Sequence, residues 1–162
     1  MFCWELATQL RRDVLPALQA SGGVKLFAVG IGSAESAAEF AARTQFPPSM
    51  LFADESEQAD AYAAAGTRNA RRDANGKQVF EGLESMWSKR TNAALKARGR
   101  DDLNGILKAY KPLMPKENAM ERALVQGGAF VFDGSKQLYA HTDFSVGDHA
   151  DLNEVLRVAL RR

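Results

Sequence analysis

The stretch Val24-Lys25-Leu26-Phe27-Ala28-Val29-Gly30-Ile31 decides the fold class of this chain. It is apolar at almost every position, whereas a strand with one face in solvent alternates apolar with polar residues. We therefore expect a β-strand that is covered on both faces. The run is strand-sized and much shorter than the roughly twenty residues that cross a bilayer, so the sequence predicts no membrane span.

A helix is predicted directly before this strand, over residues 4–19. Apolar side chains recur there every three to four residues, and charged side chains occupy the opposite face, which is typical of an amphipathic helix. Pro16 is expected to kink or shorten the last turn, and Ser21-Gly22-Gly23 is expected to end the helix.

Helices and strands continue to alternate after residue 31. Ser33 is a predicted N-cap for a helix that runs to about Thr44, and residues 50–53 predict a short strand. Asp54 and Glu57 have the spacing of a capping box for the next helix. This alternation implies parallel strands joined by right-handed crossovers, and therefore an α/β fold.

Residues 67–122 have a different character, with more basic than acidic side chains and a turn at Asn75-Gly76. We interpret this segment as a largely helical insertion. The side chains expected to pack it on the core are Trp87, Tyr110, Leu113 and Met114. Its arginines and lysines are interspersed with acids, so they predict a solvated helical face rather than a nucleic-acid site.

The last part of the chain predicts a β-hairpin followed by a helix. Residues 129–132 and 137–141 are strand-like and are separated by the turn residues Asp133-Gly134-Ser135. Asp151 and Glu154 form a capping pair for a helix that ends near residue 160.

The length and the amino-acid composition indicate one globular domain over residues 1–162. A formal net charge of +1 gives no general attraction to nucleic acid or to an acidic membrane surface. Cys3 is the single cysteine, which excludes an internal disulfide and an all-cysteine metal site and favours a reducing compartment. No phosphate-binding or dinucleotide motif is present, and we expect no cofactor.

Several segments resemble one known family. Met1-Phe2-Cys3-Trp4-Glu5 is similar to the end of a Gly-Cys-x-x-Cys motif followed by an acidic helix start, as found in the peroxiredoxin-like 2 group of the AhpC/TSA thioredoxin-fold superfamily. The resemblance continues in residues 24–31, 46–54, 126–131 and 147–150. It implies a thioredoxin-like, peroxiredoxin-like α/β sandwich that carries the insertion.

The same resemblance makes Cys3 the second cysteine of the motif. The first cysteine, and the strand that leads to it, would then precede Met1. This implies either an upstream extension of the reading frame or a truncated, inactive copy. A cysteine at a helix N-terminus is a reasonable redox residue, because unpaired N–H groups and the helix dipole stabilise a thiolate. Position alone favours a small buried apolar residue at Cys3, and the resemblance reverses this in favour of a redox residue.

Gly127 and Gly128 are the second candidate feature. From the residues alone they predict a turn at the entry to a strand, whereas the resemblance implies that they bring backbone close to the cysteine motif. His141 and His149 are the only histidines, and we expect them to be surface or capping residues because further metal ligands are lacking. Asp148 and Asp151 are expected to be loop and cap residues.

Two functions follow as hypotheses. The first is a thiol-dependent oxidoreductase that reduces peroxides or disulfides through Cys3, impaired as the chain stands, with the thioredoxin or glutathione system as its reductant. The second is a non-enzymatic thioredoxin-fold module that binds partners through the insertion. We expect a reducing location, the cytoplasm or the plastid stroma of a chloroplast, and the sequence does not indicate an oligomeric state.

Overall fold

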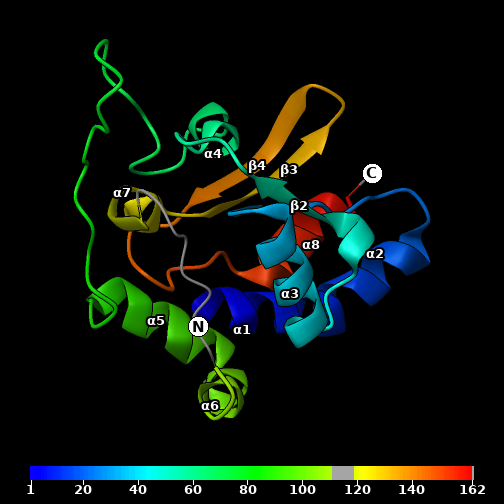
Figure 1. The fold of residues 1–162 in the computed structure, drawn as a ribbon. Helices are drawn as coiled ribbons and strands as arrows, with labels where there is room; N and C mark the ends of the chain where they lie inside the picture. Colours follow the sequence, from blue (N-terminus) through cyan, green and yellow to red (C-terminus); the bar gives the residue numbers. More distant parts are fainter. Residues whose placement is uncertain (111–118, 162) are drawn as a thin grey trace.

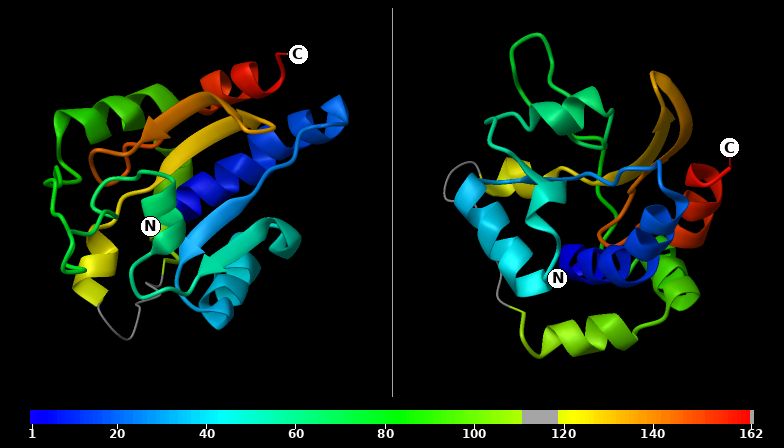
Figure 2. Two further views of the ribbon diagram at one scale, coloured as in Figure 1. Left: turned by 90° about the horizontal axis from the view of Figure 1, so that it is seen from above. Right: turned by 90° about the vertical axis from the view of Figure 1, so that its right-hand side faces the viewer.

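The computed structural model describes residues 1–110 and 119–161 (Figure 1). The strands are β1 (Ala28–Ile31), β2 (Leu51–Asp54), β3 (Gly128–Asp133) and β4 (Lys136–Thr142). The helices are α1 (Phe2–Gln9), α2 (Leu15–Ser21), α3 (Ala34–Thr44), α4 (Asp60–Ala64), α5 (Lys89–Arg98), α6 (Asp101–Leu107), α7 (Ala119–Leu124) and α8 (Leu152–Ala159). Helices α1, α2, α3, α5, α6 and α8 lie on one side of the strands and α4 lies on the other (Figures 1 and 2).

The strands form two separate two-stranded sheets. β1 and β2 are parallel, with Ala28 opposite Leu51 and Ile31 opposite Asp54, as the alternation of helices and strands predicts. β3 and β4 form the predicted antiparallel hairpin, with a register shift between Val131 and Phe132. Within the described residues no ladder joins β1 to β3, so the sandwich has a divided sheet.

The prediction that residues 24–31 form a strand covered on both faces is wrong in two respects. Only Ala28–Ile31 form the strand, and Phe27 and Val29 are 61% and 44% exposed. Phe52, opposite Val29 on β2, is 50% exposed, and its ring contacts that of Phe27 edge-to-face at 5.8 Å. Helix α3 packs against β2 on one face of this sheet, and the apolar residues on the other face remain open to solvent.

The first helix is longer than predicted and continues past Pro16. Residues Leu10–Val14 form a π-helical segment between α1 and α2, and Pro16 lies in the first turn of α2. A proline inside a helix removes a hydrogen bond and clashes with the preceding turn. The π-helical segment accommodates this defect, so that the chain continues as a helix to Ser21.

The capping predictions hold at two helices and fail in detail at a third. The side chains of Ser33 and Asp151 accept hydrogen bonds from the backbone N–H groups of Ser36 and Asn153, at the starts of α3 and α8. Asp54 instead ends β2, and α4 begins only at Asp60. Asp54 still supports α4 from a distance, because its carboxylate accepts from the N–H of Ala61 at 2.9 Å.

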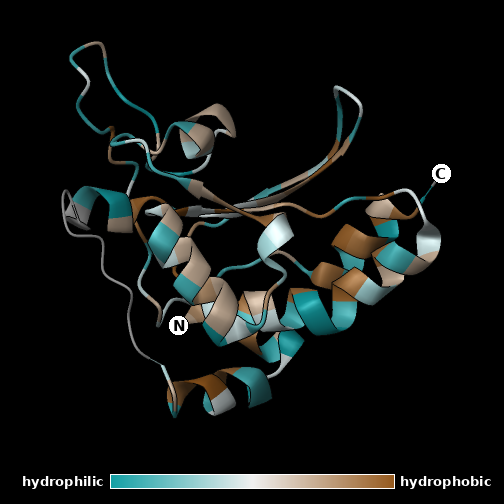
Figure 3. Ribbon diagram, turned by 45° about the vertical axis from the view of Figure 1, so that its right-hand side comes forward, coloured by the Kyte–Doolittle hydropathy of each residue, from teal (hydrophilic) through white to brown (hydrophobic). Residues whose placement is uncertain are grey.

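The segment predicted as an insertion begins with an irregular, largely hydrophilic loop at 67–88 and continues with α5, α6 and α7 (Figure 3). Leu95 and Leu103 of this segment are buried in one cluster with Phe2. Tyr110 packs edge-to-face on Trp4 at 5.4 Å, as predicted. Trp87 does not pack on the core, since it is 79% exposed, and Leu113 and Met114 lie outside the described residues.

A buried ion pair connects the first helix to this segment. Arg98 of α5 donates two hydrogen bonds to the carboxylate of Glu5, at 3.0 and 3.1 Å, and a third to the carbonyl of Gly147 at 2.9 Å. The Glu5 side chain is fully buried, and that of Arg98 is 15% exposed. The pair therefore ties together α1, α5 and the loop before α8.

Replacing Arg98 by Met is expected to lower the free energy of unfolding by about 3 kcal/mol, because it leaves the buried Glu5 carboxylate without its counter-charge. Urea unfolding followed by tryptophan fluorescence measures this loss. The matched control is Arg157→Met, which removes an exposed pair with Glu154 and is expected to cost less than about 1 kcal/mol. Equal losses in the two variants would contradict a special role for the buried pair.

Candidate functional site

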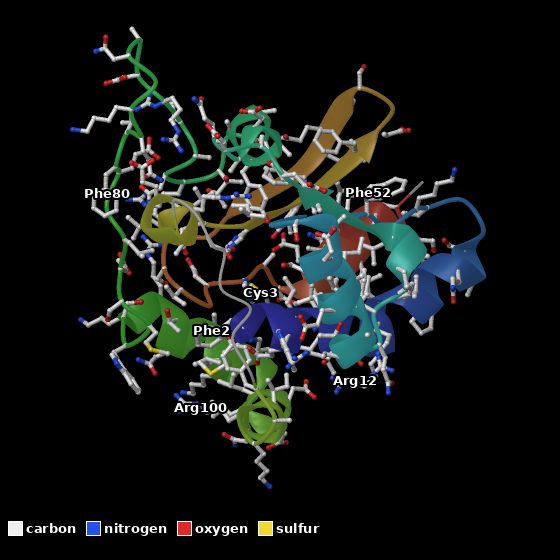
Figure 4. All side chains as sticks on the ribbon, viewed as in Figure 1. Phe2, Cys3, Arg12, Phe52, Phe80 and Arg100 are labelled. Carbon is white, nitrogen blue, oxygen red and sulfur yellow. The ribbon has the colours of Figure 1, made fainter. Side chains whose placement is uncertain are left out.

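Cys3 lies in the first turn of α1 and is exposed. Figure 4 shows it on the side of α1 that faces the strands. The helix begins without a side-chain cap, and the carbonyl of Met1 accepts hydrogen bonds from the N–H groups of Trp4 and Glu5, at 3.0 and 3.2 Å. The N–H of Cys3 itself favours a thiolate at the sulfur. Cys3 therefore occupies the predicted position at a helix N-terminus and is open to reactants.

The neighbours of Cys3 fix this turn in place. Phe2 is buried against Gly147, which has a positive φ of 84°. A Cβ atom at position 147 would lie only 2.8 Å from the Phe2 ring, so both the backbone conformation and the space require glycine. With Glu5 bound to Arg98, the residues on both sides of Cys3 are anchored to the loop that precedes α8.

The electrostatic environment of Cys3 differs from the one that its position in the helix predicts. Desolvation by the surrounding protein raises the pKa of the thiol, and the negative charge of Asp143 raises it further, while the Met1 amino group opposes both. The net direction is upward. The helix N-terminus is therefore outweighed, and the thiol form dominates at neutral pH.

Asp143 is the centre of a second group of side chains, directly after β4. Its side chain is 6% exposed and contacts both histidines of the chain: His149 Nδ1 lies 2.9 Å from Oδ2, and His141 Nε2 lies 3.2 Å from Oδ1. Burial acts to raise the pKa of Asp143, but the hydrogen bonds from His141 and His149 outweigh it and lower the pKa. The carboxylate is therefore charged and held between two imidazoles. We call these three residues the Asp143 cluster.

The two candidate glycines lie beside this cluster. The carbonyl of Gly127 accepts a hydrogen bond from the N–H of Asp143 at 3.0 Å, and a Cβ atom on Gly127 would lie 3.5 Å from Asp143 Oδ2. Gly128 starts β3, and a Cβ atom there would lie 2.5 Å from the carbonyl oxygen of His141. Gly128 thus permits the close pairing of the hairpin. Of the two, Gly127 is the one that contacts Asp143, whose negative charge raises the pKa of the Cys3 thiol.

Tyr62 of α4 interacts electrostatically with Cys3 and with Asp143. Its hydroxyl donates to the carbonyl of Val29 on β1 at 2.7 Å. Desolvation raises the pKa of Tyr62 most, and the charges of Cys3, Asp54 and Asp143 add to this. Tyr62 is therefore a neutral hydrogen-bond donor that lies within electrostatic range of both the thiol and the Asp143 cluster.

The sequence analysis missed Asp143 and Tyr62 and misplaced the histidines. The prediction that His149 is a surface or capping residue is wrong, because its side chain is 11% exposed and bound to Asp143. The alternation His141-x-Asp143 at the end of a strand, with His149 shortly after it, was the available signal. Asp151 caps α8 as predicted, and Asp148 accepts from the N–H of Phe144 within its loop.

The comparisons with known proteins give one match. Residues 9–145 match the sequence family described as AhpC/TSA antioxidant enzyme. The matched range includes Gly127, Gly128 and Asp143 and begins after Cys3. Searches of curated proteins and of solved structures found no match. Among the described helices, none has the length and apolar character that crossing a membrane requires.

The two glycines are expected to differ sharply when each is replaced by Ala. Gly128→Ala should lower the free energy of unfolding by about 1–3 kcal/mol, because its Cβ would overlap a backbone carbonyl that cannot move without breaking the hairpin. Gly127→Ala is the matched control and should change stability little, since its nearest neighbour is at ordinary contact distance. Thermal unfolding measures both, and equal effects would contradict this assignment.

Native alkylation of Cys3 by iodoacetamide is expected to go to one adduct per chain, because the single thiol is exposed. The rate should rise with pH through a midpoint above the ordinary thiol pKa of about 8.5, since only the thiolate reacts. A peptide of residues 1–5 is the unfolded control and should titrate at lower pH. A midpoint in the protein below that of the peptide would show that the helix N-terminus dominates.

Proposed function

Since the chain belongs to the AhpC/TSA antioxidant enzyme family, we propose that it is a thiol-dependent redox protein in which Cys3 is the reacting sulfur. The observation that carries this proposal is the position of Cys3: it is exposed, at the N-terminus of α1, and within the field of a buried carboxylate that binds two histidines. Oxidant and reductant can therefore reach Cys3 from solvent.

The oxidising half of the proposed cycle consumes a peroxide. The Cys3 thiolate attacks one peroxide oxygen, the O–O bond breaks, and the leaving oxygen takes a proton to become water or an alcohol. The sulfur is oxidised by two electrons to sulfenic acid while the peroxide is reduced by two. A disulfide is the alternative oxidant, and attack on it gives a mixed disulfide and releases one thiolate.

The reducing half requires a thiol from a second molecule, because Cys3 is the one cysteine of this chain. The thiol condenses with the sulfenic acid to give a mixed disulfide and water. A second thiol then attacks this disulfide, which returns Cys3 to its reduced form and releases the oxidised reductant. The thioredoxin and glutathione systems supply thiols of this kind in reducing compartments.

The raised pKa of Cys3 bears on the rate of this cycle. At neutral pH only a small fraction of the sulfur is thiolate, so attack on peroxide is slow. Together with the need for an external thiol, this supports a low turnover for the chain as it stands.

The second candidate function, a partner-binding module, is supported by the surface of the loop at 67–88. Phe80 and Trp87 are 58% and 79% exposed there, and large apolar side chains at such exposure are frequent in interaction surfaces. This candidate requires no chemistry at Cys3.

Peroxide consumption in the presence of glutathione distinguishes the two candidates. We expect the wild-type chain to consume peroxide slowly, with a glutathione adduct on Cys3 detected by mass spectrometry, and Cys3→Ser to show neither. The variant Trp87→Ala is the control, because it alters the exposed loop and should leave consumption unchanged. Equal peroxide consumption by wild type and Cys3→Ser would remove Cys3 from the mechanism and favour the binding module.

A further inference from the structure

We propose that the outer edge of β2 is a docking site for a second copy of this chain, which pairs its own β2 there in the antiparallel sense. Within the described residues, β2 pairs with β1 along one edge and with no strand along the other. Figure 2 shows β2 on the outer side of β1, away from the β3–β4 hairpin. The inference is independent of the proposed function of Cys3, because no redox step takes place at this surface.

The hydrogen bonds between β1 and β2 show which main-chain groups of the edge are unpaired. Gly32 N–H donates to the carbonyl of Asp54 at 3.1 Å, so the main-chain groups of Asp54 face β1. Because these groups alternate in direction along a strand, those of Ala53 and Leu51 face outward. The N–H of Leu51 bonds to the carbonyl of Pro48, whereas the C=O of Leu51 and both groups of Ala53 have no partner in the described part of the chain. The edge therefore offers one donor and two acceptors to another strand.

This edge lacks the features that usually prevent two sheets from joining. Residues 51–53 contain no charged side chain and no proline, and their pairing with β1 has no bulge. Most exposed edges carry a lysine, a proline or a bulge, because an unprotected edge recruits another strand. The outer edge of β2 is therefore suited to pairing between chains.

Aromatic side chains lie next to the edge on the open face of the β1–β2 sheet. Phe52 is 50% exposed, and its ring contacts that of Phe27, which is 61% exposed. Aromatic pairs across neighbouring strands stabilise a sheet, and contiguous exposed apolar side chains mark interaction surfaces. A strand added to β2 would extend this aromatic face.

On the opposite face, a groove runs between β2 and α3. Its volume is about 310 Å³, and the α3 side chains in its wall are all small: Ala34, Ala37, Ala38 and Ala41. Side chains alternate between the two faces of a strand, so Leu51 and Ala53 lie on the groove side when Phe52 lies on the open face. The groove therefore has room for an aliphatic side chain from an incoming strand.

These features favour a second copy as the occupant, because β2 is complementary to itself about a two-fold axis. With Phe52 opposite Phe52 of the second copy, Ala53 lies opposite Leu51 of the second copy. Each Ala53 N–H then donates to the Leu51 carbonyl of the other chain, and each Leu51 side chain enters the groove of the other chain. The two Phe52 residues form the closer, non-hydrogen-bonded type of cross-strand pair, in which side chains contact best.

The charges around β2 agree with the antiparallel register. Asp54 ends the strand, and Glu55 follows it at the wall of the groove. In the antiparallel pairing these acids come to lie at the start of the other strand, where Ser49 and Met50 are uncharged. Like charges therefore do not meet across the edge, whereas a parallel pairing of two copies would bring the acids together.

Sedimentation equilibrium of the wild-type chain and of Phe52→Lys tests the proposal. We expect a weak wild-type dimer, with a dissociation constant on the order of 0.1 mM, because so short an edge buries little surface. Phe52→Lys should raise this constant at least about tenfold, since it replaces the aromatic pair by two like charges. The matched control is Phe80→Lys, which makes the same change at a 58% exposed position far from β2 (Figure 4) and should leave the constant unchanged.

Equal constants for the two lysine variants, or a wild-type chain that stays monomeric at about 1 mM, would overturn the proposal. Binding of an unrelated strand-forming peptide to β2 of such a monomer would assign the edge to a different partner. That result too would contradict pairing between copies.

A disulfide trap locates the contact without the lysine variant. In a Cys3→Ser chain, Phe52→Cys places a thiol opposite its own copy, at a Cα separation of about 4.5 Å that a disulfide can span. With oxidised glutathione as the electron acceptor, we expect covalent dimers to form at least about tenfold faster than in the control Phe80→Cys. Equal rates would overturn the proposal. Neither test uses peroxide or Cys3, so failure of the redox function would be seen separately.

Discussion

The buried contact between Glu5 and Arg98 is the constraint on which the site depends. It joins the first turns of α1 to α5, and the bond from Arg98 to the carbonyl of Gly147 extends the connection to the loop before α8. Cys3 lies two residues before Glu5, and His149 lies two residues after Gly147. One guanidinium therefore fixes the relative positions of a thiol at one end of the chain and a histidine at the other. A buried charge pair is a costly way to gain stability, but its directional bonds specify one arrangement.

Local signals in the sequence predicted most of the fold. The caps at Ser33 and Asp151, the parallel strands and the hairpin around Gly134 each depend on residues close together in the chain, and each is present. The failures involve contacts between distant segments. The run at 24–31 has the composition of a buried strand, but composition does not show which face another element covers. In the same way, the size of Trp87 suggested an anchor, whereas Leu95 and Leu103 pack the segment on Phe2.

The site was predictable only in part, for a similar reason. The position of Cys3 at a helix start can be read from its neighbours, and Gly127 and Gly128 stand out at a strand entry. How Cys3 and these glycines are placed relative to one another cannot be read from the sequence. The spacing of Asp143 from the two histidines was a signal for that residue, but it does not link Asp143 to Cys3 or to the glycines. The hydrogen bond from Asp143 N–H to Gly127, and the two histidines on its carboxylate, arise from the register of the hairpin. Only the assembled β3–β4 pair brings these groups together.

The chemistry of the thiol follows from a competition between local and long-range effects. The opening turn of α1 offers N–H groups to an anion at Cys3, an advantage of limited size that acts over one turn. Cys3 is exposed, but the protein around it still desolvates a thiolate, and the negative charge of Asp143 adds to this effect, so that the pKa of the thiol is raised. Because the pKa of Cys3 is raised, less of the sulfur is thiolate at neutral pH. Each thiolate is intrinsically more nucleophilic, since nucleophilicity rises with thiol pKa. The arrangement therefore favours a sulfur that is mostly protonated at neutral pH and is protected from indiscriminate oxidation.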